Sequence, residues 1–221
     1  GREARLPEQG YHGQYLVELA EALVAERGAG FADQPADAAI PACRDFAVAA
    51  LKAEQRADLA GFRVRFDVFF DESRLYQEGR IERCLAALQA HGALFEEGGA
   101  LWLRTTAHGD DKDRVLRKSD GTYTYFLPDI AYHQDKAARG FDRAIDVWGA
   151  DHHGYVARMR AAMRSLGQPA GFFDAIIVQL VTVLKDGVEV KMSKRAGEFI
   201  ALRELVDEVG VDAARYFFLM R

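Results

Sequence analysis

This sequence has few cysteines, no long apolar run and no excess of positive charge. The two cysteines, Cys43 and Cys84, lie far apart and form no Cys-x-x-Cys pair, so neither a structural zinc site nor a disulfide framework is expected. No apolar stretch approaches the length of a membrane span, and the first residues lack a signal-peptide pattern. The formal net charge of −5 argues against a protein that coats nucleic acid, although a local contact with RNA stays open. We therefore expect a soluble, cytoplasmic protein with no membrane or DNA partner.

The composition is that of an ordinary globular protein. Of its 221 residues, 49% are hydrophobic and 29% are charged, which suffices for one large domain or two small ones with a core. In the first half, periodicity and turn residues predict an α+β arrangement. We expect helices over 13–27 and 42–59, a strand over 63–70, a helix over 71–92 and a hairpin over 93–103. The polar stretch 105–118 is interpreted as a loop with solvated aspartates rather than as a metal site.

From residue 120 onward, predicted strands and helices alternate. A strand or extended entry at 121–126 precedes a helix up to Arg139, and strands at 144–148 and 175–178 flank a helix at 156–166. This alternation is typical of a doubly wound parallel sheet, in which ligands bind beyond the carboxyl ends of the strands. We therefore expect an α/β fold whose ligand-binding rim carries the loops that follow its strands.

A basic loop, Lys191–Gly197, lies between a predicted hairpin at 181–190 and a predicted helix at 202–210. Its ammonium groups suit a polyphosphate, because cations aimed at the spreading negative charge of a transferring nucleotide stabilise the transition state. Ser193 can add a hydroxyl donor. The alternative is a solvated basic turn, which is the usual role of such a cluster taken alone.

Tyr125 and Asp129 are four residues apart at the predicted start of a helix, with Pro128 between them. A carboxylate held there can pair with a planar guanidinium through two parallel hydrogen bonds, and a phenol can add an acceptor or a stacking face. The alternative is that Asp129 merely favours the positive end of its helix and that Tyr125 packs in the core.

The string Gly149–Gly154 follows a predicted buried strand and contains Asp151, His152 and His153. Its glycines let the backbone approach a ligand closely, and Asp151 can accept hydrogen bonds from ribose hydroxyls. A metal role for the two histidines is weakly supported, because adjacent side chains point in different directions. A structural histidine pair remains the alternative.

Four strings occur here in the same order and at similar spacing as in arginyl-tRNA synthetases, which are class I enzymes: Tyr123–His133, Val147–Tyr155, Lys191–Gly197 and Val211–Phe217. The chain resembles that family over most of its length. The resemblance implies half of a Rossmann-like catalytic domain and the substrates arginine, ATP with Mg²⁺, and tRNA(Arg). It implies that the arginine guanidinium is recognised by Tyr125 and Asp129 with His152 nearby. It also implies an ATP site comprising Gly149, Asp151, His152, Lys191, Met192 and Lys194, with Lys191, Ser193 and Lys194 as the catalytic residues of the phosphate loop.

The resemblance also shapes the expected organisation of the chain. Class I synthetases carry a His-x-Gly-His motif, and no such string occurs here. We therefore expect a middle fragment with an insertion-like α+β part at 1–106, the second half of the catalytic domain at 107–200, and a helical exit toward an anticodon-binding domain at 201–221. The missing motif also leaves open a non-catalytic derivative that binds tRNA or protein. A synthetase for another amino acid is disfavoured by Tyr125 and Asp129.

Overall fold

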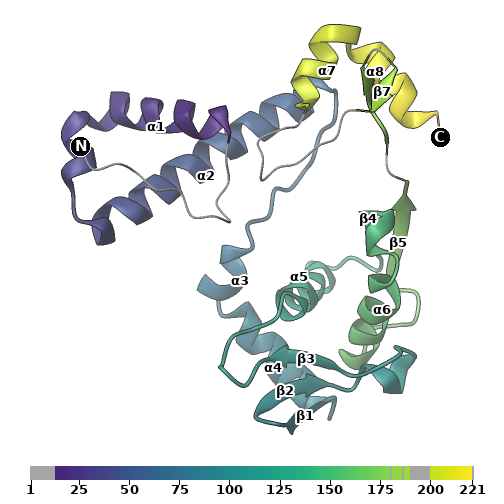
Figure 1. The fold of residues 1–221 in the computed structure, drawn as a ribbon. Helices are drawn as coiled ribbons and strands as arrows, with labels where there is room; N and C mark the ends of the chain where they lie inside the picture. Colours follow the sequence, from purple (N-terminus) through teal and green to yellow (C-terminus); the bar gives the residue numbers. More distant parts are fainter. Residues whose placement is uncertain (1–12, 180, 186, 190–199, 221) are drawn as a thin grey trace. The chain divides into compact units, whose positions relative to one another are not determined.

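The computed structural model describes residues 13–179, 181–185, 187–189 and 200–220. The chain divides into two compact units, one formed by Val68–Leu180 and the other by Gly1–Asp67 with Val181–Arg221 (Figure 1). The sequence-based division at residues 106 and 200 stays a prediction.

The unit Val68–Leu180 contains a three-stranded antiparallel sheet in the order β1-β2-β3. The strands are β1 (Leu94–Glu97), β2 (Ala100–Leu103) and β3 (Arg114–Arg117). The predicted hairpin is confirmed, and Gly98 and Gly99 make its turn with φ of +59° and +76°, values that favour glycine. The interpretation of 105–118 as a loop with solvated aspartates is wrong in two respects. β3 pairs with β2 and inserts Leu116 into the core, and Asp110 is buried rather than solvated. Because β3 begins and ends with an arginine, its sequence lacks the apolar pattern that predicts a strand.

Two predictions for the segment before this sheet need correction. Residues 63–70 pair with no strand in the described part of the chain, because an alternating pattern cannot make a strand without a neighbouring backbone to bond. The helix predicted over 71–92 is divided into α3 (Ser73–Gln77) and α4 (Arg80–Ala90). Gly79, with φ of +64°, lies at the break.

The second half of this unit has the predicted α/β alternation. Helix α5 (Phe126–Ala138) is followed by β4 (Ala144–Gly149), α6 (Tyr155–Ser165) and β5 (Phe173–Val178). β4 and β5 are parallel from the Ala144–Phe173 pair to the Gly149–Val178 pair, and α6 supplies the crossover that parallel neighbours require (Figure 1). Of the two alternatives at 121–126, a strand or an extended entry, the strand is wrong, since Tyr123 makes only an isolated bridge to Arg117 and α5 already begins at Phe126.

One hydrophobic core joins these elements. It is built from apolar side chains of α3, α4, β2, β3, α5, α6, β4 and β5 and of the segment just before β5. Its largest fully buried members include Leu75, Ile81, Leu88, Leu103, Leu116, Leu127, Ile130, Met159, Met163 and Phe172. In β4, Ala144 and Trp148 face this core, whereas Ile145 and Val147 are exposed, as the period of two of a strand dictates. The core therefore holds the amino ends of α5 and α6 in place.

The other unit is mainly helical. It comprises α1 (Gln14–Arg27), the 3₁₀ helix η1 (Ala29–Asp33), α2 (Ala36–Gly61), the short strands β6 (Leu184–Lys185) and β7 (Val188–Glu189), α7 (Leu202–Val209) and α8 (Val211–Leu219). The hairpin predicted over 181–190 is confirmed by the pairing of β6 with β7. Helix α2 begins six residues earlier than the expected position 42. Arg203 forms ion pairs with Glu54 and Asp58, joining α7 to α2. No helix among the described residues is long and apolar enough to cross a membrane.

Candidate functional site

The candidate site lies at the carboxyl end of β4. α5 runs antiparallel to β4 and α6 leaves directly after it, so the first turns of both helices come to this edge of the sheet. The 3₁₀ helix η3 (Ala150–His152) lies between β4 and α6. Helix amino termini carry partial positive charge and free N–H groups, so this edge suits an anionic ligand.

Asp129 is the half-buried acid of the site. It lies in the first turn of α5, and its Oδ2 accepts a hydrogen bond of 2.7 Å from the hydroxyl of Tyr155 at the start of α6. Burial raises the pKa of Asp129 above its ordinary value, and the Tyr155 hydroxyl and the nearby imidazoles of His133 and His152 offset this only in part. A partly desolvated carboxylate of this kind gains most from a cationic partner.

Tyr155 is held by aromatic rings on two sides. Its ring meets Trp148 edge-on at a centroid distance of 5.6 Å and Phe126 at 5.7 Å, and the guanidinium of Arg158 lies 4.8 Å from its centroid. Burial and the negative charge of Asp129 raise the pKa of Tyr155 far above its ordinary value. The phenol therefore stays protonated and acts as a fixed hydrogen-bond donor toward Asp129.

A charged cluster supports α5 from behind. Nδ1 of His133 lies 2.7 Å from the backbone oxygen of Asp129, and its Nε2 lies 2.9 Å from Oδ2 of Asp146 on β4. Lys136 donates to the other oxygen of Asp146 at 2.8 Å. Burial alone would raise the pKa of Asp146, but the side chains of His133 and Lys136 hold it below its ordinary value. The cluster ties the first turn of α5 to the strand.

Neither this cluster nor the contact of Tyr155 with Asp129 was predicted from the sequence. Asp146 was the available signal, because an acid in a short buried strand needs a partner. His133 and Lys136 are three residues apart on one helix, so they share a face and could have been proposed as those partners. Tyr155 offered no comparable local signal, since its contact with Asp129 depends on how α5 and α6 pack.

The structure does not bring the phenol of Tyr125 to the carboxylate of Asp129. Tyr125 is the residue that precedes α5, its backbone oxygen accepts the N–H of Asp129 at 3.4 Å, and its side chain is 89% exposed. The alternative that it packs in the core is therefore wrong. Its ring is available to a ligand at this edge of the sheet.

Gly149, Asp151 and His152 line the exposed rim beside Asp129. A Cβ on Gly149 would lie 2.7 Å from Oδ1 of Asp151, so glycine leaves the space that this carboxylate occupies. Nε2 of His152 lies 3.6 Å from Oδ2 of Asp151, and its ring centroid lies 6.1 Å from that of Trp148. Both side chains are mostly exposed. Of these residues, His152 lies close enough to the half-buried Asp129 to lower its pKa, and the roles of all three in ATP and amino acid binding stay predictions.

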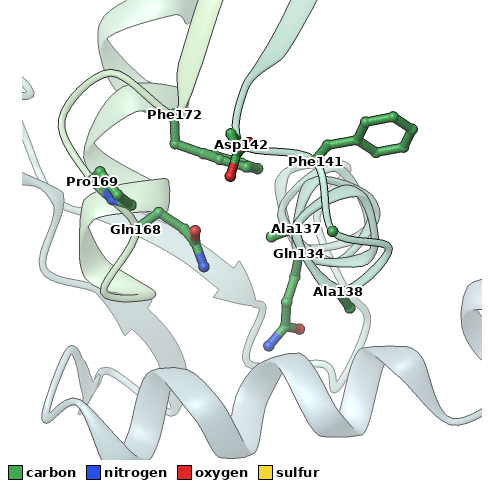
Figure 2. Close-up of a pocket in the computed structure, with 9 residues that line it drawn as sticks. Gln134, Ala137, Ala138, Phe141, Asp142, Gln168, Pro169 and Phe172 are labelled. Carbon is green, nitrogen blue, oxygen red and sulfur yellow. The ribbon is translucent and has the colours of Figure 1, made fainter.

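The remaining predicted residues are Lys191, Met192, Ser193 and Lys194, and they lie outside the described residues. A separate cavity of about 450 Å³ lies at the other end of α5. Gln134, Phe141, Gln168 and Phe172 are among its lining residues (Figure 2). It adjoins the amino end of β4, whereas ligands of parallel α/β sheets bind at the carboxyl ends. We therefore place the candidate site at Asp129 and not in this cavity.

Comparison with known proteins decides the family. The family described as "tRNA synthetases class I (R), catalytic domain" matches residues 40–217, where R is the one-letter code for arginine. The chain belongs to this family. Family members related to it include the arginine–tRNA ligases of Oceanobacillus iheyensis and Bacillus subtilis, each 49% identical over all 221 residues. The chain spans 40% of the length of these relatives.

Solved structures in the arginyl-tRNA synthetase family agree. A protein from Campylobacter jejuni described as an arginyl tRNA synthetase matches the whole chain with a TM-score of 0.90 and 38% identity, over 47% of its own length. The Thermus thermophilus arginyl-tRNA synthetase matches 87% of the chain and 38% of its own length, with a TM-score of 0.61 and 21% identity, and shares the fold. These matches confirm the resemblance and the α/β class expected from the sequence.

Proposed function

We propose that this chain supplies part of the active site of an arginine–tRNA ligase. The arginine carboxylate attacks the α-phosphorus of ATP, the bond to the β-phosphate breaks, and arginyl-adenylate and pyrophosphate form. A terminal ribose hydroxyl of tRNA(Arg) then attacks the activated carbonyl, and AMP leaves. The observation that carries the proposal is the half-buried Asp129 carboxylate at the ligand-binding edge of the sheet.

In this proposal Asp129 binds the guanidinium of arginine. The substrate cation replaces water around a carboxylate whose burial already disfavours its charge, so the ion pair forms in a setting of low dielectric. The exposed phenol of Tyr125 is placed to close over the planar guanidinium, and His152 borders the amino acid. The reaction needs positioning and charge stabilisation, and no protein nucleophile takes part.

ATP is proposed to bind along the rim that starts at Gly149. Asp151 accepts hydrogen bonds from the ribose, and the amino terminus of α6 faces the anionic end of the nucleotide. The basic loop is proposed to complete the site, with Met192 against the nucleotide and with Lys191, Ser193 and Lys194 on its phosphates. No group of three or more His, Cys, Asp and Glu side chains in the described part of the chain is placed to hold a metal ion. Mg²⁺ is therefore proposed to arrive with the ATP phosphates.

The test is arginine-dependent ATP–pyrophosphate exchange in a full-length arginine–tRNA ligase that carries this chain as its matching segment. Asp129→Asn removes the counter-charge and should lower kcat/KM for arginine more than a hundredfold, about 3 kcal/mol, without admitting lysine. Lys194→Ala serves as the contrasting variant. It should lower kcat about a hundredfold and leave the arginine KM unchanged, because its charge acts on the developing pyrophosphate.

The outcomes test the roles of Asp129 and of the basic loop separately. An Asp129→Asn enzyme within a few-fold of the parent would show that Asp129 does not bind the guanidinium. An effect of Lys194→Ala confined to the KM for ATP would show that the loop binds substrate without acting in the transition state. No exchange by the unmodified protein, with retained tRNA binding, would favour the non-catalytic alternative.

A further inference from the structure

We propose that Tyr155 is a positioning residue for arginine recognition, because its hydroxyl fixes the orientation of the Asp129 carboxylate and leaves acceptor positions on both carboxylate oxygens for the guanidinium. The inference rests on the proposed function, since it takes arginine as the ligand of Asp129. The sequence alone predicts no role for Tyr155. It reaches Asp129 from a different helix, 26 residues further along the chain.

The Asp129 carboxylate has enough acceptor positions for both the Tyr155 hydroxyl and a guanidinium. Tyr155 occupies one acceptor position on Oδ2, at 2.7 Å. Within the described part of the chain, Oδ1 has no hydrogen-bond partner. A carboxylate has about four acceptor positions, so a guanidinium can still make two parallel hydrogen bonds, one to each oxygen. The hydroxyl and the substrate can therefore bind the same carboxylate together.

The fixed ring of Tyr155 limits the orientations of the Asp129 carboxylate. The terminal torsion of an aspartate is broad, so an unsupported carboxylate samples many orientations. The phenol cannot follow it, because its ring is fixed between Trp148 on β4 and Phe126 on α5. The hydroxyl consequently selects one carboxylate plane before arginine arrives. Pre-set orientation of a binding group reduces the entropy that the ligand would otherwise lose on binding.

Electrostatics supplies a readout that packing alone would not change. The charged and titratable groups facing Asp129 are His133 on α5, Asp146 on β4, His152 on η3 and Tyr155 on α6. Burial and Asp146 raise the pKa of Asp129, and the other three groups lower it. Removing the Tyr155 hydroxyl deletes one of the lowering contributions and leaves burial in place. The pKa of Asp129 should rise, and arginine binding should begin to fail at a higher pH.

The experiment compares Tyr155→Phe with Tyr132→Phe as a matched control. Both substitutions remove one phenolic hydroxyl, but the Tyr132 ring packs on Phe70, and its hydroxyl makes no hydrogen bond within the described residues. The first measurement is an NMR titration of the Asp129 side-chain carboxyl carbon in this chain. The second is the pH profile of kcat and KM for arginine in the full-length ligase. Tyr155→Phe should raise the arginine KM about tenfold, leave kcat nearly unchanged, and shift the acid limb of kcat/KM to higher pH.

A second substitution keeps the proposal testable if Tyr155→Phe fails to fold. Replacing Tyr155 with 3-fluorotyrosine preserves the ring and makes the hydroxyl a stronger donor, so the pKa of Asp129 should fall. Movement of the Asp129 titration in these directions, with Tyr132→Phe unchanged, supports the inference. An unchanged Asp129 titration, or a tenfold KM effect that Tyr132→Phe reproduces, overturns it. If Asp129→Asn itself leaves arginine activation intact, the proposed function fails first, and the two failures are thereby distinguished.

Discussion

The buried ion pair between Arg114 and Asp110 gives the sharpest prediction about stability. Arg114 lies on β3. Its guanidinium donates two hydrogen bonds to Asp110, from Nε to Oδ2 at 2.7 Å and from Nη2 to Oδ1 at 2.9 Å. The side chains are only 12% and 2% exposed. Arg114→Leu fills similar apolar space but leaves the Asp110 carboxylate buried without its cation.

The magnitude follows from the burial of the partner that remains. Breaking a buried pair by removing one member costs about 3–5 kcal/mol, because the other charge stays desolvated. Arg117→Leu is the matched control on the same strand. Its partner Glu96 lies 3.6 Å away, and the side chains of Arg117 and Glu96 are 40% and 74% exposed, so that substitution should cost less than about 1 kcal/mol. The double variant Arg114→Leu with Asp110→Asn should regain much of the loss.

The contribution of Asp110 to stability should depend on pH with opposite signs in the parent and in the Arg114→Leu variant. Burial alone would raise the pKa of Asp110, but Arg114 and the neighbouring donors hold it well below its usual range. In the parent, the pair therefore stabilises the fold above the unfolded pKa of about 3.9, and this contribution is lost as the pH falls through the lower folded pKa. Without Arg114, burial should raise the folded pKa above the unfolded one. The variant then gains relative stability as the pH falls, and the two stability curves should converge in acid.

Urea unfolding followed by tryptophan fluorescence measures this difference. Both tryptophans, Trp102 and Trp148, lie in the unit Val68–Leu180 and report on the unfolding of that unit. Equal losses for Arg114→Leu and Arg117→Leu at pH 7 would refute the reasoning. A penalty for Arg114→Leu that grows as the pH falls would refute it as well.

Three glycines give further predictions. Gly167→Ala and Gly140→Ala should each cost about 1–2 kcal/mol in urea unfolding, because φ is +77° and +88° at these positions. A Cβ at position 167 would lie 2.9 Å from Cε1 of His91, but that side chain is exposed and can move, so a much larger cost for Gly167→Ala would contradict this reasoning. Gly149→Ala should change stability by less than about 0.5 kcal/mol, since the clashing Asp151 side chain is exposed and can move. In the full-length ligase it should raise the KM for ATP about tenfold, and an unchanged KM would show that Asp151 does not bind the nucleotide.

The sequence was sufficient wherever the signal is local. The alternation over β4, α6 and β5 follows from apolar spacing and bounding glycines, because backbone geometry sets those periods within a few residues. The turn at Gly98 and Gly99 needs positive φ, which their residue type permits. The place of Asp129 in the first turn of α5 could be predicted for the same reason.

Only the tertiary structure decided the features that depend on distant partners. Residues 63–70 have strand-like alternation and no strand to pair with, whereas β3 carries charges and is a strand because β2 lies beside it. Asp129 receives its hydrogen bond from Tyr155, and Asp146 receives its partners from α5, only after the helices pack on the sheet. Local propensity is set by a few neighbouring residues, but the desolvation and hydrogen bonding of a buried acid are set by whatever the fold brings against it.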